Sequence, residues 1–260
     1  MSNSGRAARA IIDTLTVGWR EEAANEMSSE SKNPLPSAIF QIAPDGQPTP
    51  RQRRRILIEM CLRRMSPGTF TSPELLSRRT AVNKWPDLNK ILEGIPWVIT
   101  GGVATRAYMP ERMTHDLDIL IHKMNCETAW RRFKEHGFLV AEVLDSPYFV
   151  ARRADIPEVD VLCLDFPWLE RAFAEARQDP AGFPVLDLPF LIIMKLKANR
   201  GIDVGDMTRM LGLASEEERD RVRETVAVYQ PEDSDDLEAL ILLGKMEFKD
   251  ISRGRPEIFE

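Results

Sequence analysis

Cysteine is scarce in this chain of 260 residues. Its three cysteines, Cys61, Cys126 and Cys163, are far apart in the sequence and show no Cys-x-x-Cys spacing. This pattern argues against a disulfide framework and against a zinc knuckle, because both need grouped cysteines. A reducing compartment fits this usage best, so we expect the protein in the cytoplasm.

Long apolar runs and a surplus of positive charge are also lacking. No stretch approaches the roughly 20 apolar residues that span a bilayer, and the N-terminus has no hydrophobic core of the signal-peptide type. We therefore expect no membrane partner. The net charge of −6 argues against a protein that coats nucleic acid by bulk charge, but it leaves room for a local basic patch. The composition is 43% hydrophobic and 29% charged, which is ordinary for a globular protein.

Composition changes along the chain suggest four segments. Residues 23–50 are rich in Ser, Asn, Pro and Gly, which is typical of a linker or a loosely docked arm. Apolar residues at helical spacing follow, then alternating strands and helices, then helices alone. The predicted divisions are a flexible arm over 1–50, a basic helical segment over 51–93, an α/β core over 94–166 and a helical region over 167–260.

Arginine is concentrated in the basic helical segment. Residues 51–80 contain eight arginines and only two acidic residues, Glu59 and Glu74. Two helices are predicted here, the second with Ser72 as its N-cap and Pro73 at its first position. The arginines have two interpretations: solvated helix faces, or a platform that contacts the phosphates of a nucleic acid or nucleotide.

Strand and helix patterns alternate between residues 96 and 166. Apolar strand patterns occupy five short stretches, interrupted by helical patterns over 103–109 and 126–138. This order predicts an α+β fold with one mixed sheet. The predicted strands cover residues 96–100, 116–121, 138–144, 148–154 and 158–165. Five helices are predicted after them, over residues 167–177, 188–200, 203–213, 216–229 and 235–246.

Two aspartates interrupt one of the predicted buried strands. Asp116 and Asp118 are two residues apart, so their side chains share one face of the strand while Leu117 and Ile119 point to the other. Two adjacent carboxylates repel each other, and a hard divalent cation such as Mg²⁺ is their natural counter-charge. Asp160 interrupts another strand in the same way and offers a third ligand.

Context separates this pair from a second Asp-x-Asp in the chain. Asp233 and Asp235 lie in an acidic run that reads as a solvated helix start. The first pair instead follows a strand and the glycines Gly101 and Gly102. These glycines either make a tight turn, since they tolerate positive φ, or let the backbone approach a phosphate.

The order of these elements resembles the nucleotidyltransferase superfamily typified by DNA polymerase β. That pattern has two glycines, a spacer, an Asp-x-Asp and a later third carboxylate, here Asp160. A further segment resembles the AbiEii-like branch, which contains the nucleotidyltransferase toxins of type IV toxin–antitoxin systems. The resemblance covers about residues 94 to 215, and the residues of its further segment are Lys195, Arg200, Asp203 and Asp206.

The resemblance implies transfer of a nucleoside monophosphate from a nucleoside triphosphate to an acceptor hydroxyl, with release of pyrophosphate. It implies two Mg²⁺ ions on Asp116, Asp118 and Asp160, which are also the catalytic residues together with Lys195. Lys195 is expected to contact the triphosphate, although a lysine that reaches solvent from a surface helix is an alternative. The expected nucleotide-binding residues are Gly101, Gly102, Arg106, Arg112, Arg200 and Asp206.

Several of these assignments have a second interpretation. Arg106 and Arg112 flank the glycine turn and the aspartate pair, where a surface role is equally compatible with the sequence. Asp203 and Asp206 either orient Lys195 or Arg200, or cap a helix that begins near Val204, and we favour the cap for Asp203.

The basic segment favours a large anionic acceptor, so RNA, and tRNA in particular, is the predicted acceptor of a toxin-like enzyme with an antitoxin partner. One alternative is transfer to a small molecule such as an aminoglycoside, or to a protein. Another is a non-catalytic binding module with the same fold. We expect ATP binding, but these residues do not specify which nucleoside triphosphate is used.

Overall fold

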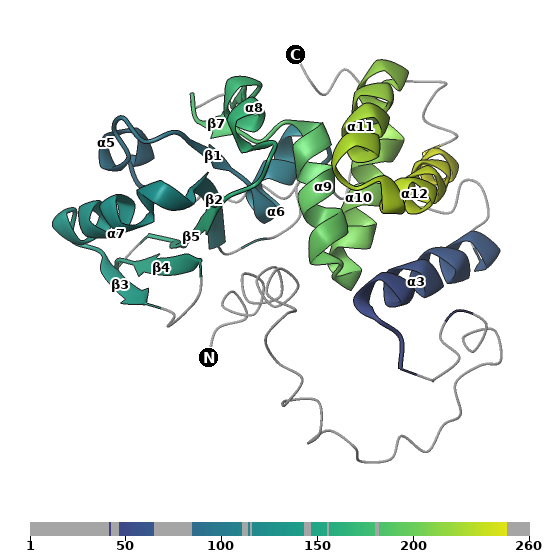
Figure 1. Ribbon diagram of the computed structural model, residues 1–260, viewed down its shortest axis with the longest axis horizontal. Coiled ribbons are helices and arrows are strands. Elements are labelled where there is room, and N and C mark those ends of the chain that lie inside the picture. The colour runs from purple at the N-terminus through teal and green to yellow at the C-terminus, as the bar shows by residue number, and fades with distance from the viewer. Residues whose placement is uncertain are drawn as a thin grey trace.

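The computed structural model describes residues 42, 47–64, 85–110, 114, 116–142, 147–154, 156–179 and 182–248. In this part of the chain a mixed β-sheet lies beside a group of C-terminal helices, and helix α3 packs on the latter (Figure 1). This arrangement confirms the predicted α+β fold class. Most of the arm predicted over residues 1–50, and the whole predicted helix that begins at Ser72, lie outside the described residues.

The described residues form a seven-stranded sheet in the order β3-β4-β5-β2-β1-β7-β6. Pairs β2–β5 and β1–β7 are parallel, and the other pairs are antiparallel. The two-residue strands β6 and β7, which extend the sheet beyond β1, were not predicted because runs this short carry no periodicity. The strands are β1 (Trp97–Ile99), β2 (Asp116–His122), β3 (Leu139–Glu142), β4 (Tyr148–Arg152), β5 (Glu158–Leu164), β6 (Arg177–Gln178) and β7 (Pro184–Val185).

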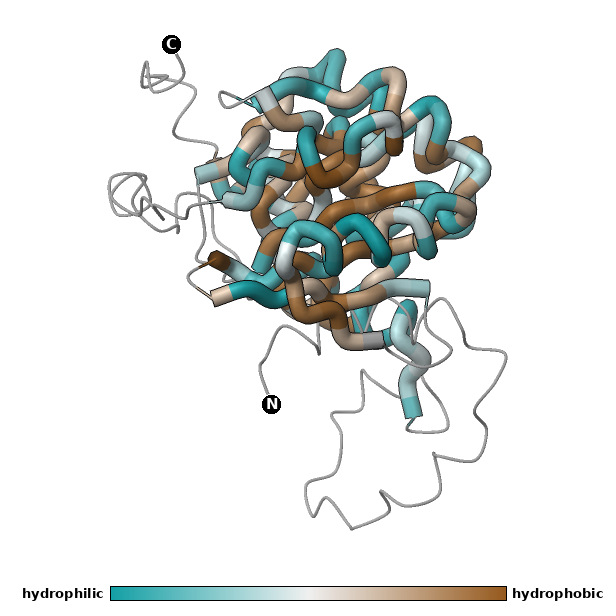
Figure 2. Tube along the Cα trace, turned by 90° about the vertical axis from the view of Figure 1, so that its left-hand side faces the viewer, coloured by the Kyte–Doolittle hydropathy of each residue, from teal (hydrophilic) through white to brown (hydrophobic). Residues whose placement is uncertain are grey.

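The central strands β2 and β5 are buried on both faces. Leu117, Ile119 and Ile121 of β2 are at most 1% exposed, and Val159, Val161 and other apolar residues of β5 are equally covered. Strands buried on both sides are nearly continuous apolar runs, and the apolar segments of the chain lie in its interior (Figure 2). The aspartates in these strands are therefore exceptions that need a reason.

Helix α7 (Cys126–Glu135) packs on the sheet face opposite the aspartates. Its Phe133 is fully buried, with edge-to-face ring contacts to Phe138 and Phe149 at centroid distances of 5.2 and 5.7 Å. The helix ends before Gly137, whose φ of 79° agrees with the predicted glycine stop. Short helices α5 (Leu88–Ile91) and η3 (Lys123–Asn125) flank it.

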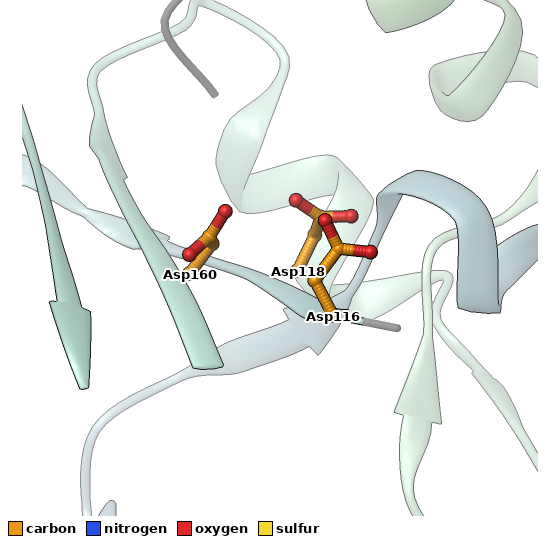
Figure 3. Close-up of side chains that lie close together, drawn as sticks. All are labelled: Asp116, Asp118 and Asp160. Carbon is orange, nitrogen blue, oxygen red and sulfur yellow. The ribbon is translucent and has the colours of Figure 1, made fainter. Parts of the chain in front are cut away.

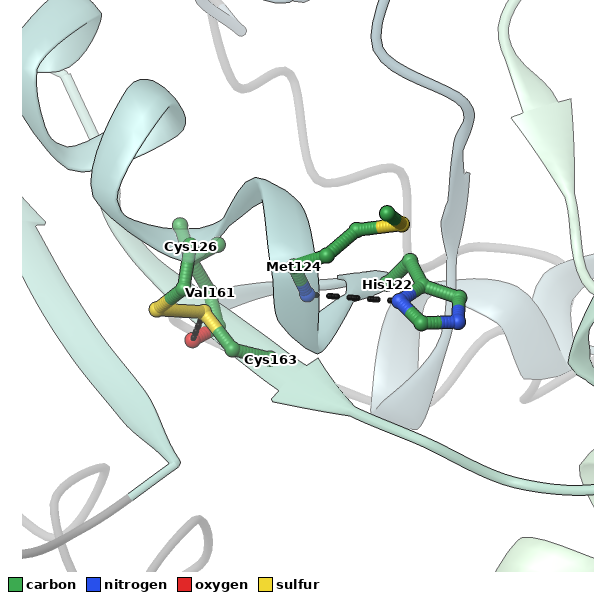
Figure 4. Close-up of a disulfide and its surroundings, with 5 residues drawn as sticks. All are labelled: His122, Met124, Cys126, Val161 and Cys163. Carbon is green, nitrogen blue, oxygen red and sulfur yellow. Dashed lines mark hydrogen bonds between the residues drawn. A yellow bond between two sulfur atoms is a disulfide. The ribbon is translucent and has the colours of Figure 1, made fainter.

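Cys126 at the start of α7 forms a disulfide with Cys163 of β5, and the two sulfur atoms meet on the helix-covered face (Figure 4). The expectation that the chain lacks a disulfide is therefore wrong. The two cysteines are 37 residues apart, so spacing gives no signal, and they meet only because α7 folds back across β5. Cys61, on α3, is free and exposed.

The C-terminal helices pack closely on one another. At the crossing of α10 and α12, Gly212 and Gly244 face each other with no space for a side chain, since a Cβ on Gly244 would lie 2.3 Å from the carbonyl oxygen of Thr208. The helices in this region are α8 (Leu169–Ala174), α9 (Leu188–Ala198), α10 (Gly201–Leu213), α11 (Glu216–Tyr229), η4 (Pro231–Asp233) and α12 (Ser234–Glu247). No helix among the described residues combines the length and apolar character that a bilayer span requires.

Helix α3 (Pro50–Arg64) belongs to the predicted basic segment. Its Arg51, Arg53 and Arg55 are exposed, whereas Arg54 is buried and cannot reach an external phosphate. Arg54 is 2% exposed and forms ion pairs with Asp233 at 2.6 Å and Asp236 at 2.9 Å. Arg51 also pairs with Asp233, and Arg53 donates to the carbonyl of Pro48. The acidic run at 231–238, interpreted as a solvated helix start, is thus partly buried, because it supplies the counter-charges for α3.

Candidate functional site

Three carboxylates from two neighbouring strands meet on one face of the sheet (Figure 3). Asp118 of β2 and Asp160 of β5 are direct partners in the parallel register, and Asp116 lies two residues earlier on the same face of β2. One oxygen of each carboxylate lies within 4.8 Å of the others. The structure thus brings together the three residues that the sequence analysis selected.

The burial of these carboxylates opposes their ionisation. Asp160 is fully buried and Asp118 is 7% exposed. Burial, and then the charge of Asp116, raises the pKa of Asp118 to about 6. Burial, and then the charges of Asp118 and Asp116, raises the pKa of Asp160 to about 8. The site therefore holds negative charge at neutral pH only at a cost, which a bound cation would remove.

The contacts of Asp160 fit a metal ligand. Both of its carboxylate oxygens are buried without a hydrogen-bond partner in the part of the chain that the structure describes, although buried polar atoms nearly always have one. Asp116 accepts a hydrogen bond from the hydroxyl of Thr114 at 2.6 Å, which holds its orientation. Three carboxylates are hard oxygen donors of the kind that Mg²⁺ prefers. The residues present therefore fit the divalent metal that the resemblance implies.

The glycine turn lies directly against the carboxylates. Gly101 has a φ of 64°, and a Cβ at this position would lie 1.9 Å from Oδ2 of Asp118. The peptide N–H of Gly102 donates a hydrogen bond to Asp118, which lowers the pKa of that carboxyl but does not outweigh its burial. Gly101 and Gly102 begin the four-residue helix α6 (Gly101–Ala104), which continues as η2 (Thr105–Ala107). The turn thus needs glycine at Gly101 for both conformation and space.

Lys195 lies in a buried ion-pair cluster. Its Nζ is 3.0 Å from Oδ1 of Asp203 and 2.7 Å from Oδ2 of Asp206, and its side chain is only 3% exposed. It therefore does not extend to solvent, so the surface-lysine alternative is wrong. Two of its three donors are used inside the protein. Asp206, predicted to bind nucleotide, contacts this lysine, and the predicted nucleotide contacts of both residues stay predictions.

Arg200 is the cation that acts most strongly on Asp118. Its guanidinium pairs with Asp203 at 2.7 Å. The positive charge of Arg200 lowers the pKa of Asp118 more than the positive charge of Lys195 does. Arg200 is also the N-cap of α10, where Asp203 accepts a hydrogen bond from its backbone N–H. Asp203 therefore combines the capping and orienting roles, in a helix that begins at Gly201 and not near Val204.

The two remaining predicted arginines differ in what the structure shows. Arg106 lies in η2, next to the glycine turn, with its guanidinium carbon 5.7 Å from the ring centroid of Trp85. This contact favours neither the phosphate nor the surface interpretation. Arg112 lies outside the described residues, so its predicted contact with nucleotide stays a prediction.

Two residues that the sequence analysis did not include in the site lie beside the triad. Glu158 is the register partner of Asp116, and it forms an ion pair with Arg152 of β4. The charge of Glu158 raises the pKa of Asp160 and that of Arg152 lowers it, so both are close to the carboxylates. The alternation of side chains along a strand could have predicted the position of Glu158, because Glu158 and Asp160 are two residues apart and share one face of β5.

Comparisons with known proteins give only distant similarity. No family model and no curated protein matches the chain. Two solved structures of the antibiotic-resistance factor ANT(2'')-Ia align with it. The solution structure has 19% identity and a TM-score of 0.34, and covers 65% of this chain and 94% of that one. The crystal structure with adenylyl-2''-tobramycin has 21% identity and a TM-score of 0.33, and covers 62% and 96%. These TM-scores are low, so the similarity by itself assigns neither activity nor acceptor.

Proposed function

We propose that this protein is a Mg²⁺-dependent nucleotidyltransferase, which transfers a nucleoside monophosphate from a nucleoside triphosphate to an acceptor hydroxyl. The observation that carries the proposal is the convergence of Asp116, Asp118 and Asp160 on one sheet face beside Gly101. A purely structural role does not account for Asp160, since its buried oxygens have no hydrogen-bond partner among the described residues.

Each group of residues has a role in this reaction. Asp116, Asp118 and Asp160 would hold the metal, and Gly101 leaves the room that the carboxylate of Asp118 occupies. Arg200 would face the negative charge of the phosphates, with Asp203 fixing its orientation. Mg²⁺ bound at these carboxylates would neutralise phosphate charge and assist both the attacking and the leaving oxygen. The chain's own contribution is positioning and electrostatic complementarity.

The acceptor is a separate question. The RNA acceptor was predicted from the arginines of residues 51–80, and the structure weakens that support. Arg54 is buried in ion pairs and Arg51 is paired with Asp233. Transfer to a small molecule or to a protein hydroxyl is thus at least as compatible with the described surface. The toxin-like branch and an antitoxin partner remain predictions from the sequence.

Incubation with each of the four α-³²P-labelled nucleoside triphosphates and Mg²⁺, with one class of acceptor at a time, tests this proposal. Total tRNA, a panel of aminoglycosides and a mixture of proteins represent the three acceptor classes. We expect label on one class together with release of unlabelled pyrophosphate. The acceptor that carries the label identifies the substrate class.

The matched control is Asp118→Asn, which keeps the size of the side chain and removes its charge. This variant should lose at least about a thousandfold in rate while its circular dichroism stays unchanged. Transfer that persists in Asp118→Asn would refute the site assignment. Nucleotide or RNA binding without any transfer by the wild type would favour the non-catalytic binding module.

A further inference from the structure

A second site lies away from the carboxylates, where helix α3 meets the end of α9 and the turn η4. The cavity there has a volume of about 380 Å³. Its walls include Lys197 and Asn199 at the end of α9, Tyr229 and Gln230 at the end of α11, and Glu232 of η4. None of the three metal-binding carboxylates contributes to it. Its size is within the range of small-molecule sites.

Two amide side chains in the cavity wall have unused hydrogen-bonding capacity. Within the described ranges, Oδ1 of Asn199 and Oε1 of Gln230 are buried and have no hydrogen-bond partner, and Gln230 is only 9% exposed. A buried amide oxygen without a partner is costly and calls for an explanation. Both residues line the cavity, and the terminal torsions of Asn and Gln are broad, so rotation about them presents the amide to a ligand. The wall therefore offers two acceptors to a ligand that carries N–H donors.

The charges around the cavity are balanced within the protein. Asp233 pairs with both Arg51 and Arg54. Burial lowers the pKa of Lys197, and the carboxylate of Glu232 acts in the opposite direction, so this lysine has a counter-charge nearby. The walls thus select neither an anion nor a cation, and hydrogen-bond donors on a neutral ligand decide recognition.

We propose that this cavity binds a nucleobase that carries an exocyclic amine, of the adenine type. Asn and Gln amides pair well with the amine and ring nitrogens of adenine, and the ring of Tyr229 supplies an aromatic wall on which a flat base stacks. The proposal does not depend on the nucleotidyl-transfer activity, because it uses none of the carboxylates. Asn199 immediately precedes Arg200, the cation whose charge acts most strongly on Asp118.

The proposal is tested by calorimetric titration of the full-length protein with adenosine and with inosine in the presence of EDTA. Inosine is the matched ligand, since a carbonyl replaces the amine that the two amide oxygens recognise. We expect saturable binding of adenosine, and binding of inosine that is at least about tenfold weaker. Without metal or phosphates, neither nucleoside has a reason to occupy the carboxylate site.

Three variants locate the bound base. Asn199→Gly removes the amide, and glycine suits the backbone φ of 55° at this position, so the fold should persist. Gln230→Met removes the second amide at similar length. Both should weaken adenosine binding at least about tenfold, whereas Asp118→Asn should leave it unchanged. Equal binding of adenosine and inosine, no saturation by adenosine, or full affinity in Asn199→Gly would each overturn the proposal, as would loss of binding in Asp118→Asn alone.

Discussion

At the scale of single residues, the raised pKa values of Asp118 and Asp160 predict that the metal-free protein loses stability as the pH rises. In the unfolded chain these carboxyls ionise near pH ~4, whereas the folded chain keeps Asp160 protonated up to about pH 8. Between these values the unfolded state binds fewer protons than the folded state, so the free energy of unfolding falls with increasing pH.

Asp160→Asn removes the carboxyl group whose proton is bound in the folded state and lost in the unfolded state. Near pH ~4 the variant and the wild type should be similarly stable in EDTA, because the wild-type carboxyl is neutral there. At pH 8 the variant should be the more stable by at least about 1 kcal/mol, and Mg²⁺ should stabilise only the wild type. Thermal unfolding at both pH values, with EDTA or Mg²⁺, measures this. A stability difference between Asp160→Asn and the wild type that does not grow from pH 4 to pH 8 in EDTA would contradict it.

Gly101 is the residue whose side chain the site cannot accommodate. Gly101→Ala places an L-residue at a φ of 64° and a methyl group 1.9 Å from a carboxylate oxygen of Asp118. We expect a loss of more than ~2 kcal/mol in unfolding free energy and of Mg²⁺ binding. Gly94→Ala is the control, since its φ of 73° gives similar backbone strain with nothing within 4 Å. Equal effects of both substitutions on Mg²⁺ binding would show that the contact with Asp118 is unimportant.

Lys195 is expected to stabilise the fold beside the site, because it neutralises the buried carboxylates of Asp203 and Asp206. Lys195→Met leaves Asp203 and Asp206 buried with less counter-charge, which should cost roughly 3–5 kcal/mol in unfolding free energy. The double variant Lys195→Met with Asp206→Leu removes one charge of each sign and should recover most of that loss. Denaturant unfolding measures the structural role of Lys195, and the KM for nucleotide measures a role in nucleotide binding. A stable double variant whose KM rises strongly would show that the pair of Lys195 and Asp206 takes part in nucleotide binding, whereas an unchanged KM would show a structural role alone.

The sequence predicted the centre of the site better than its surroundings. Three acidic residues inside apolar strands can be recognised from the sequence alone, because the alternation of side chains along a strand places Asp116 and Asp118 on one face. The ion pairs of Lys195 and Arg200 depend on how α9 packs against α10. Glu158 shares a face of β5 with Asp160, but its pairing with Asp116 depends on the register of β2 with β5, which no local pattern specifies.

At the scale of secondary-structure elements, the crossing of α10 and α12 depends on two glycines. A Cβ on Gly244 would lie 2.3 Å from the carbonyl oxygen of Thr208, so Gly244→Ala must push the helices apart. We expect a loss of at least ~2 kcal/mol in unfolding free energy. Gly205→Ala on the exposed side of α10 meets nothing within 4 Å and should stabilise by about 0.5 kcal/mol. Urea denaturation compares them, and a neutral Gly244→Ala would refute the close packing.

Helices and strands with strong periodicity were predicted within a few residues, as β2, β5, α7 and α11 show. Contacts between distant elements were not. The disulfide between Cys126 and Cys163 joins a helix start to a strand, and neither cysteine has a local signature. The start of α10 at Gly201 was also missed, because glycine and isoleucine are weak helix signals and the capping residue is an arginine.

At the scale of the whole molecule, the buried arginine of α3 changes the interpretation of the charge pattern. A cluster of like charges in the sequence does not reveal counter-charges that arrive from residues about 180 positions later. Arg54, Asp233 and Asp236 instead attach the N-terminal helix to the C-terminal ones. The fold class could be predicted from the order of elements, whereas the partners of this basic helix required the structure.

Manganese binding measured by electron paramagnetic resonance tests the central claim most directly. Mn²⁺ is a spectroscopic substitute for Mg²⁺ at oxygen ligands, and the titration is done with a non-hydrolysable nucleoside triphosphate present. The wild type should bind Mn²⁺ at least about tenfold more tightly than Asp118→Asn and Asp160→Asn. Equal Mn²⁺ affinity in all three proteins would show that these carboxylates do not form a metal site.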